Sequence, residues 1–123
     1  MKRKILIIDD EKEFAQMVKL NLESTNRYEV RTESKGSQGL SVAQAFKPDL
    51  ILLDVIMPDM AGSEVARRLK DDHSTNHIPI VFLTATVLKE EIESRGSVIG
   101  GNLFIAKPAN VDEIIQCIEK NIK

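Results

Sequence analysis

The chain has 123 residues, a length that favours one domain built around a single hydrophobic core. Apolar residues make up 42% of it, and 17 basic against 19 acidic side chains give a formal net charge of -2. This balance argues against a nucleic-acid or membrane-surface binder, and no apolar run is long enough to span a bilayer. Cys117 is the only cysteine, which excludes an intrachain disulfide and fits a reducing cytoplasm.

Short apolar runs typical of strands alternate with helical patterns along the whole chain. The run 50–53 is the most apolar strand, whereas 28–32 alternates weakly and is expected at an edge of the sheet. In chain order, strands are predicted at 5–8, 28–32, 50–53, 80–83 and 103–106. The helices between the first four strands carry Phe14, Met17, Val18 and Leu22, then Leu40, Ala43 and Phe46 before Pro48 ends the helix, then Val65, Ala66 and Leu69. A short helix is expected within 89–95, and Asn110 can cap a last helix with Val111, Ile114, Ile115, Ile118 and Ile122 on one stripe.

Five strand–helix units predict a doubly wound (βα)5 three-layer sandwich with a five-stranded parallel sheet, formed by residues 1–123 as one domain. Parallel strands need helical crossovers, and these crossovers are right-handed. Ligands of such sheets bind outside the carboxyl ends of the strands, where the strand order reverses. Five polar side chains fall at or just after predicted strand ends: Asp9, Asp10, Asp54, Thr84 and Lys107.

Three of these polar side chains are carboxylates. Asp9 and Asp10 end the first apolar run, and Asp54 ends the third. If the two strands are neighbours, three anions meet at one edge of the sheet, where they repel one another and lose hydration. A hard divalent cation would relieve this repulsion, and carboxylate oxygens suit Mg²⁺. Taken alone, Asp54 could equally cap a turn, and Asp9, Asp10 and Glu11 could serve only the positive end of the first helix.

Four segments of the chain, taken together, resemble the receiver domain of two-component response regulators, whose single-domain archetype is the chemotaxis regulator CheY. They cover all five predicted strands, in order, over essentially the whole chain. The segments are Ile5-Leu-Ile-Ile-Asp-Asp-Glu11, Pro48-Asp-Leu-Ile-Leu-Leu-Asp-Val-Ile-Met-Pro-Asp-Met-Ala-Gly62, Ile78-Pro-Ile-Val-Phe-Leu-Thr-Ala85 and Phe104-Ile-Ala-Lys-Pro108. The resemblance implies a flavodoxin/CheY-like fold and a phosphorylation site.

The resemblance implies that Asp54 is the phosphoryl acceptor. Asp9 and Asp10 would hold Mg²⁺ with it, Asp10 most directly, and the backbone carbonyl of Ile56 would supply another oxygen. Lys107 would be the cation of the site, pairing with Asp54 before phosphorylation and with the phosphoryl oxygens afterwards. An aspartyl phosphate is a labile mixed anhydride, which suits a transient signal. Taken alone, Lys107 is typical of a solvated surface lysine.

Thr84 and Phe104 are implied to be the switch hydroxyl and the switch aromatic. A hydroxyl that donates to a new phosphoryl oxygen moves its loop, and the space that it leaves can admit a ring. Phe104 stands where tyrosine is common in this family, so its switching would act through packing alone. Without the resemblance, Thr84 is typical of strand packing and Phe104 of a core. Ile56 and Thr86 would border the path of attacking water, and bulky Ile56 is expected to slow hydrolysis.

The implied function is that of a cytoplasmic signalling domain, not an enzyme with an external substrate, although it would catalyse its own phosphorylation and slow dephosphorylation. The phosphoryl donor would be a sensor histidine kinase or a histidine phosphotransfer protein. The output would be a downstream protein effector or a fused output domain, since the sequence fits both a stand-alone regulator and one part of a larger regulator. We expect a monomer or a phosphorylation-dependent dimer, with no direct binding to nucleic acid or membrane.

Two competing functions have weaker support in the sequence. A Mg²⁺-dependent phosphohydrolase would typically have a second Asp two residues after the nucleophile, where this chain has Ile56. A pseudo-receiver that only docks to a partner is disfavoured by the intact Asp10, Asp54, Thr84 and Lys107.

Other residues that could carry chemistry have simpler interpretations. His73 and His77 could bind a transition metal if they lay on a helix, but 71–77 is typical of a polar loop. Cys117 is expected to be a partly buried structural thiol, and Gly100-Gly101 a flexible turn before the fifth strand.

Overall fold

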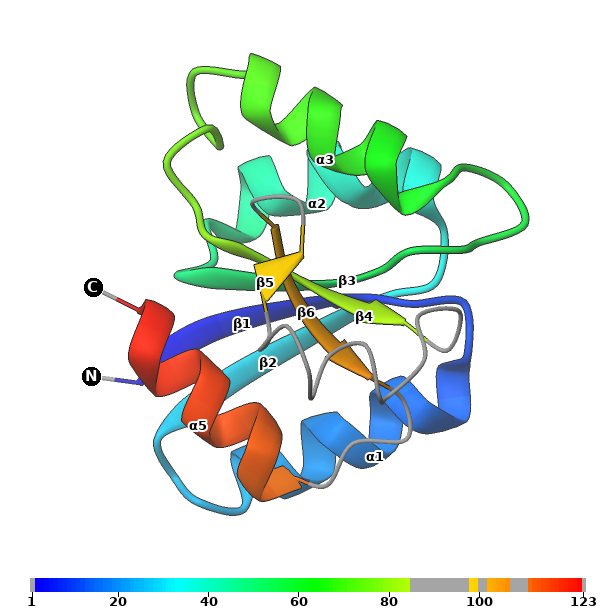
Figure 1. Cartoon of the computed structure of the whole chain (residues 1–123). Helices are drawn as coiled ribbons and strands as arrows, with labels where there is room; N and C mark the ends of the chain where they lie inside the picture. The colour runs from blue at the N-terminus through cyan, green and yellow to red at the C-terminus, as the bar shows by residue number, and fades with distance from the viewer. Residues whose placement is uncertain (1, 85–97, 100–101, 107–110, 123) are drawn as a thin grey trace.

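The structure is a computed structural model that describes residues 2–84, 98–99, 102–106 and 111–122. In chain order, its elements are β1 (Arg3–Ile8), α1 (Lys12–Glu23), β2 (Tyr28–Glu33), the 3-10 helix η1 (Gly36–Gln38), α2 (Gly39–Phe46), β3 (Leu50–Asp54), α3 (Gly62–Asp71), β4 (Ile80–Thr84), β5 (Val98–Ile99), β6 (Asn102–Ala106) and α5 (Val111–Asn121). Figure 1 shows α2 and α3 on one face of the sheet and α1 and α5 on the other, which confirms the predicted three-layer sandwich.

The strand order is β2-β1-β3-β4-β6-β5. The five predicted strands are all present, and the neighbours among them pair in parallel. The order reverses at β1, which has β2 on one side and β3 on the other. The carboxyl ends of β1 and β3 therefore form the crevice where a doubly wound sheet binds its ligands.

The sheet also has a sixth strand that the sequence did not predict. The two residues of β5 pair with β6 in the antiparallel sense, with Val98 opposite Leu103 and Ile99 opposite Asn102. An antiparallel pairing needs only two residues between the strands, whereas a parallel one needs a crossover. The expectation of an entirely parallel, five-stranded sheet was therefore incomplete at this edge.

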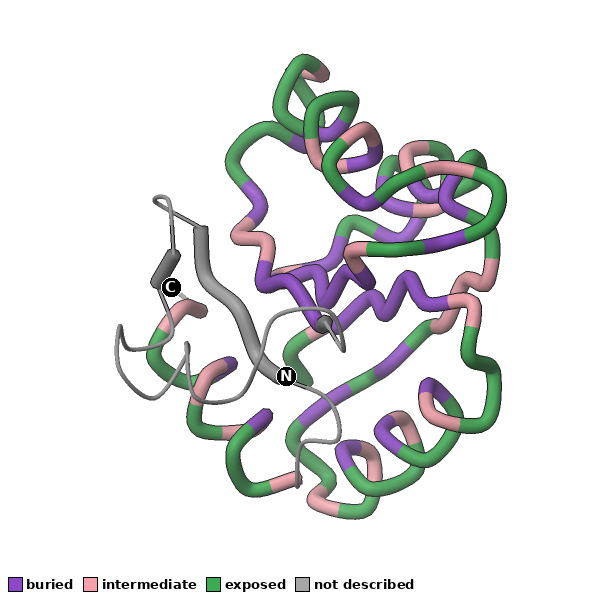
Figure 2. Tube along the Cα trace, turned by 45° about the vertical axis from the view of Figure 1, so that its right-hand side comes forward, coloured by how far each residue is buried: buried purple, intermediate pink, exposed green. Residues whose placement is uncertain are grey.

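The two central strands are buried on both faces, as a continuous run of apolar residues predicts. Alternate residues of β1 and β3 face opposite helix layers, and Figure 2 shows these strands as a buried band through the molecule. One cluster faces α1 and α5 and includes Ile5, Ile7, Leu50, Leu52, Ala15, Val18, Ile114 and Ile118. The other faces α2 and α3 and includes Leu6, Ile8, Ile51, Leu53, Ala43, Phe46, Val65 and Leu69.

The predicted helices that fall in the described residues are all present, with one change of face. In α1 the buried positions are Ala15, Val18 and Leu22, whereas Met17, which the spacing grouped with the apolar stripe, is 39% exposed. The helix predicted within 89–95 and the cap at Asn110 lie outside the described residues. Among the described helices, none combines the length and the hydropathy that crossing a bilayer requires.

Candidate functional site

The strand register brings Asp9 and Asp54 together at the carboxyl ends of β1 and β3. Ile8 pairs with Leu53 in parallel, so the residues that follow them emerge side by side. Both carboxylate residues extend the ladder of hydrogen bonds: the backbone N–H of Asp9 donates to the Glu33 oxygen at 2.9 Å, and Asp54 pairs with Leu83 of β4. Both residues are buried, with exposed fractions of 1% and 5%.

A third carboxylate joins these two. Ligand oxygens of Asp9, Glu11 and Asp54 all lie within 4.8 Å of one another. The backbone N–H of Glu11 donates to Oδ1 of Asp9 at 2.9 Å, which folds the chain back over Asp9 before α1 begins. Three carboxylates at this spacing form a donor set that suits a hard divalent cation. We call Asp9, Glu11 and Asp54 the acidic cluster.

The sequence predicted three carboxylates at this edge but pointed to Asp10 as the third. Asp10 is half-buried and does not belong to the acidic cluster, so its role as the most direct metal ligand stays a prediction. The sequence held a signal for Glu11 that was missed. Aspartate side chains commonly accept a hydrogen bond from the backbone two residues later, and that bond brings the second residue close to the carboxylate.

The loop between β3 and α3 closes over the end of the strand that carries Asp54. The backbone N–H of Gly62 donates to the Val55 oxygen at 2.8 Å, and the N–H of Val55 donates to the Leu83 oxygen at 3.1 Å. Ile56, the next residue, is 60% exposed. The predicted participation of its backbone carbonyl in metal binding stays a prediction.

The remaining predicted site residues are placed only in part. Thr84 ends β4, one residue beyond the partner of Asp54, and pairs with Ala106 at the end of β6. Phe104 lies within β6, opposite Phe82. The backbone therefore brings the ends of β4 and β6 to the edge that holds the acidic cluster. Lys107 and Thr86 lie outside the described residues.

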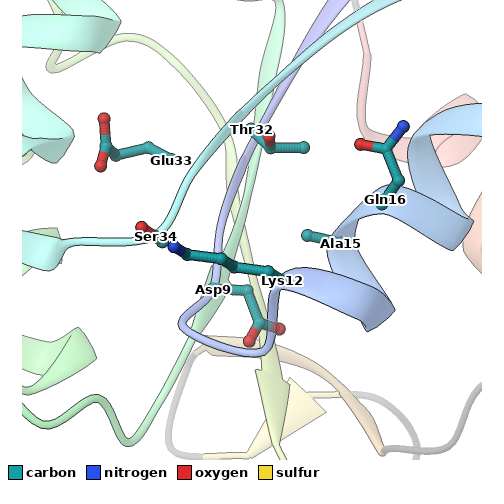
Figure 3. A pocket seen from close by; sticks show the side chains of 7 residues that line it. All are labelled: Asp9, Lys12, Ala15, Gln16, Thr32, Glu33 and Ser34. Carbon is teal, nitrogen blue, oxygen red and sulfur yellow. The ribbon is translucent and has the colours of Figure 1, made fainter.

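A hollow of about 290 Å³ adjoins the acidic cluster at Asp9. Figure 3 shows that its walls come from the first turns of α1 and from the end of β2. The lining residues are Asp9, Lys12, Ala15, Gln16, Thr32, Glu33 and Ser34. Lys12 thus places a cationic side chain in the same hollow as Asp9 of the acidic cluster.

The two histidines are not part of this site. His73 and His77 are exposed in the segment between α3 and β4, at the opposite edge of the sheet, where the sequence predicted a polar loop. Within the described ranges, the acidic cluster is the one group of metal-ligating side chains that comes together, and it contains neither histidine. Cys117 is half-buried, as predicted, and burial raises the pKa of its thiol.

Comparisons with known proteins agree with this geometry. The chain is 38% identical to the nisin biosynthesis regulatory protein NisR of Lactococcus lactis over 120 residues, covering 98% of this chain and 50% of NisR. It is 38% identical to the response regulator PleD of Caulobacter vibrioides, covering 94% of this chain and 24% of PleD. The chain thus spans half or less of these two relatives. It spans 95% of the polar-differentiation response regulator DivK of Brucella abortus, to which it is 33% identical.

Solved structures show the same fold. Chemotaxis protein CheY4 of Vibrio cholerae superposes with a TM-score of 0.83 at 29% identity, covering 99% of this chain and all of that one. A response regulator of Chloroflexus aurantiacus gives a TM-score of 0.81 at 27% identity, covering 98% and 97%. The sequence model of one protein family, the response regulator receiver domain, matches residues 5–119 of this chain. The chain belongs to the response regulator receiver domain family.

Proposed function

We propose that Asp54 accepts a phosphoryl group in a Mg²⁺-dependent reaction and that the resulting charge changes the surface read by a partner. The observation that carries this proposal is the position of Asp54, buried at the carboxyl end of β3 with two other carboxylates within 4.8 Å. A carboxylate next to two others can act as a nucleophile when a bound cation offsets their negative charge.

The proposed reaction exchanges one bond to phosphorus for another. A carboxylate oxygen of Asp54 attacks the phosphorus of a phosphohistidine, the phosphorus–nitrogen bond breaks, and the imidazole leaves with its electron pair. Mg²⁺, when bound, offsets the charge of the entering phosphoryl group and aligns it with Asp54. Asp9, Glu11 and Asp54 would hold the ion, and the resemblance adds Asp10 and the Ile56 carbonyl.

The proposed donor is a sensor histidine kinase or a histidine phosphotransfer protein, and the proposed reader is a protein effector or an attached output domain. Lys107 would offset charge on the phosphoryl oxygens, while Thr84 and Phe104 would transmit the change. Thr86 would tune the lifetime together with Ile56. A phosphohydrolase remains disfavoured, because exposed Ile56 stands where such an enzyme would carry an acid/base Asp.

Acetyl phosphate tests the acceptor directly. After incubation with Mg²⁺ and acetyl phosphate, the intact mass should rise by one phosphoryl group in the wild type and stay unchanged in Asp54→Asn or after chelation. An absence of adduct under every condition would overturn the proposal in favour of a docking module. Sustained phosphate release from many substrates would overturn it in favour of a phosphohydrolase.

A further inference from the structure

Asp59 joins two loops that lie far apart in the sequence. It lies in the loop 55–61, five residues after Asp54, and its carboxylate accepts two backbone N–H groups from η1. Gly36 donates to Oδ1 at 3.1 Å, and Ser37 donates to Oδ2 at 3.0 Å. Each oxygen of the carboxylate therefore has its own donor, a bidentate arrangement that fixes position and orientation together.

The two loops are also packed against each other without spare room. Gly36 is buried, and a Cβ on it would lie 3.0 Å from Cγ2 of Val65, 3.1 Å from Cε of Met57 and 3.2 Å from Cβ of Met60. Met57 and Met60 flank Asp59 in the loop. The close approach at Gly36 thus lets η1 come near enough for its N–H groups to reach the carboxylate.

The loop 55–61 is consequently held at two places. At its base, the Gly62 N–H binds the Val55 oxygen at 2.8 Å, next to Asp54. At its far side, Asp59 is anchored to η1. Ile56 lies between the two anchors, so the position of its backbone depends on both.

The anchor at Asp59 is charged at neutral pH. The N–H of Ser37 is the main cause that lowers the pKa of Asp59 below its usual value, and the Gly36 N–H acts in the same direction. Hydrogen bonds from N–H groups to an ionised carboxylate are stronger than those between neutral partners. The loop is therefore held by a bond that persists across the physiological pH range.

We propose that Asp59 is a positioning residue for the metal: it anchors the loop 55–61 to η1 so that the Ile56 carbonyl stays beside the acidic cluster. This inference rests on the proposed function, in which that carbonyl is a metal ligand. Residues that orient metal ligands without touching the ion typically contribute about 10- to 100-fold to metal affinity. Removal of the Asp59 carboxylate should weaken Mg²⁺ binding by about 10-fold, the lower end of that range.

The test compares Asp59→Ala and Asp59→Asn with two control variants of the full chain. Asp72→Ala removes another loop carboxylate, a half-buried one that accepts the backbone N–H of Ser74 at 2.9 Å, beyond the end of α3 and away from the acidic cluster. Glu13→Gln removes one negative charge from the exposed surface of the first turn of α1. Calorimetry gives the Mg²⁺ affinity, and acetyl phosphate labelling at increasing Mg²⁺ gives the maximal rate.

We expect Asp59→Ala to bind Mg²⁺ about 10-fold more weakly and to reach the wild-type labelling rate at saturating Mg²⁺. Asp59→Asn keeps one acceptor oxygen and should lose less, and both controls should keep the wild-type affinity. Thermal unfolding checks that each variant is folded; if Asp59→Ala is not, Asp59→Asn carries the comparison.

Three results would overturn the inference. If folded Asp59 variants bind Mg²⁺ with the wild-type affinity, the anchor at Asp59 does not contribute to metal binding. Equal losses in Asp59→Ala, Asp59→Asn and Glu13→Gln would show a general effect of charge. A wild-type protein that neither binds Mg²⁺ nor takes a phosphoryl group would refute the proposed function itself, and the inference with it.

Discussion

A Cβ on Gly62 would overlap the backbone oxygen of Asp54 and would lie 2.9 Å from the Cα of Val55. The first turn of α3 therefore rests directly on the end of the strand that carries the proposed phosphoryl acceptor. The atoms in question belong to the backbone, so no rotation of a side chain can make room. Gly62 is required here for close approach, since its φ does not lie in the left-handed region.

We expect Gly62→Ala to destabilise the fold by about 1–3 kcal/mol, the usual cost of overpacking. Alanine is otherwise the better helix former, so a loss of stability isolates the steric conflict. Because the displaced atoms belong to Asp54, acetyl phosphate labelling should also slow. Urea denaturation and intact mass give the two values. Ser63→Ala, in the same turn but exposed, is the control, and a Gly62→Ala variant as stable as that control would contradict this account.

Mg²⁺ should raise the melting temperature of the wild type, because a ligand that binds only the folded state stabilises it by about 2.7 kcal/mol at 100 times its Kd. Asp9→Asn and Glu11→Gln remove members of the acidic cluster and should lose most of this rise. Asp10→Asn tests the ligand that the resemblance favours. Glu13→Gln should respond like the wild type. A full Mg²⁺ response in Glu11→Gln would exclude Glu11 from the metal site.

Ile56→Asn should shorten the lifetime of the phosphoryl group several-fold. Ile56 is 60% exposed next to Val55 at the end of β3, and a smaller, polar side chain there would admit and orient water. Loss of the phosphoryl mass over time, after removal of excess acetyl phosphate, measures the rate. Ile56→Leu keeps the apolar bulk and should behave like the wild type. An unchanged or longer lifetime in Ile56→Asn would refute the role.

Tyr28 should titrate far above the usual pH for a tyrosine. Its hydroxyl donates to Oε1 of Glu119 at 2.7 Å, and Arg27 binds the same oxygen at 2.9 Å. Burial, followed by the Glu119 carboxylate, raises the pKa of Tyr28 to about 12. The chain has one tyrosine and no tryptophan, so ultraviolet absorbance reports on this residue directly. A folded-state midpoint near the ordinary value of 10 would contradict the contact.

The raised pKa also predicts how stability depends on pH. Between pH 10 and about 12 the folded protein keeps a proton that the unfolded chain has lost, so stability falls as pH rises through this window. Below pH 10 the contribution is fully present. Tyr28→Phe should cost about 0.5–1.5 kcal/mol near neutral pH, the net worth of a hydrogen bond. It should also flatten the alkaline fall, measured by urea denaturation at several pH values.

Thr75→Val should destabilise the protein more than Thr25→Val. Both hydroxyls donate to a carbonyl near the end of a helix, Thr75 to Leu69 at 2.6 Å and Thr25 to Leu22 at 2.8 Å. Thr75 is 1% exposed, so its loss leaves a buried oxygen without a donor, at a cost of about 1–3 kcal/mol. Thr25 is only half-buried, and water can replace it. If urea denaturation gives the same loss of unfolding free energy for both variants, burial does not decide the cost of removing the hydroxyl.

The apolar pattern predicted the buried central strands, and it predicted that Asp9 and Asp54 meet on the condition that their strands are neighbours, which the strand order confirms. Continuous apolar runs identify strands buried on both faces, and the strand order then sets their carboxyl ends side by side. The resemblance added roles that a pattern of apolar residues could not supply. It did not place Glu11 in the acidic cluster, since that position depends on a turn held by one hydrogen bond to Asp9.

Contacts between distant segments were beyond prediction from local pattern. Tyr28 meets Glu119 across 91 residues, and Asp59 meets Gly36 across 23. Neither pair has a periodic signal, because each depends on how loops and helix ends are placed around the sheet. The two-residue strand β5 was missed for another reason: two apolar residues are too short a run to distinguish a strand from a turn.

The edges of this sheet are unfavourable places for a second molecule to add a strand. On one side β2 exposes Glu29 and Arg31 along its length, and charged side chains on an edge discourage pairing with another chain. On the other side the outermost described strand, β5, offers only two residues of backbone. These edges therefore favour an association of two copies through helix or loop surfaces, in which the hydrogen bonds of each sheet stay within one copy.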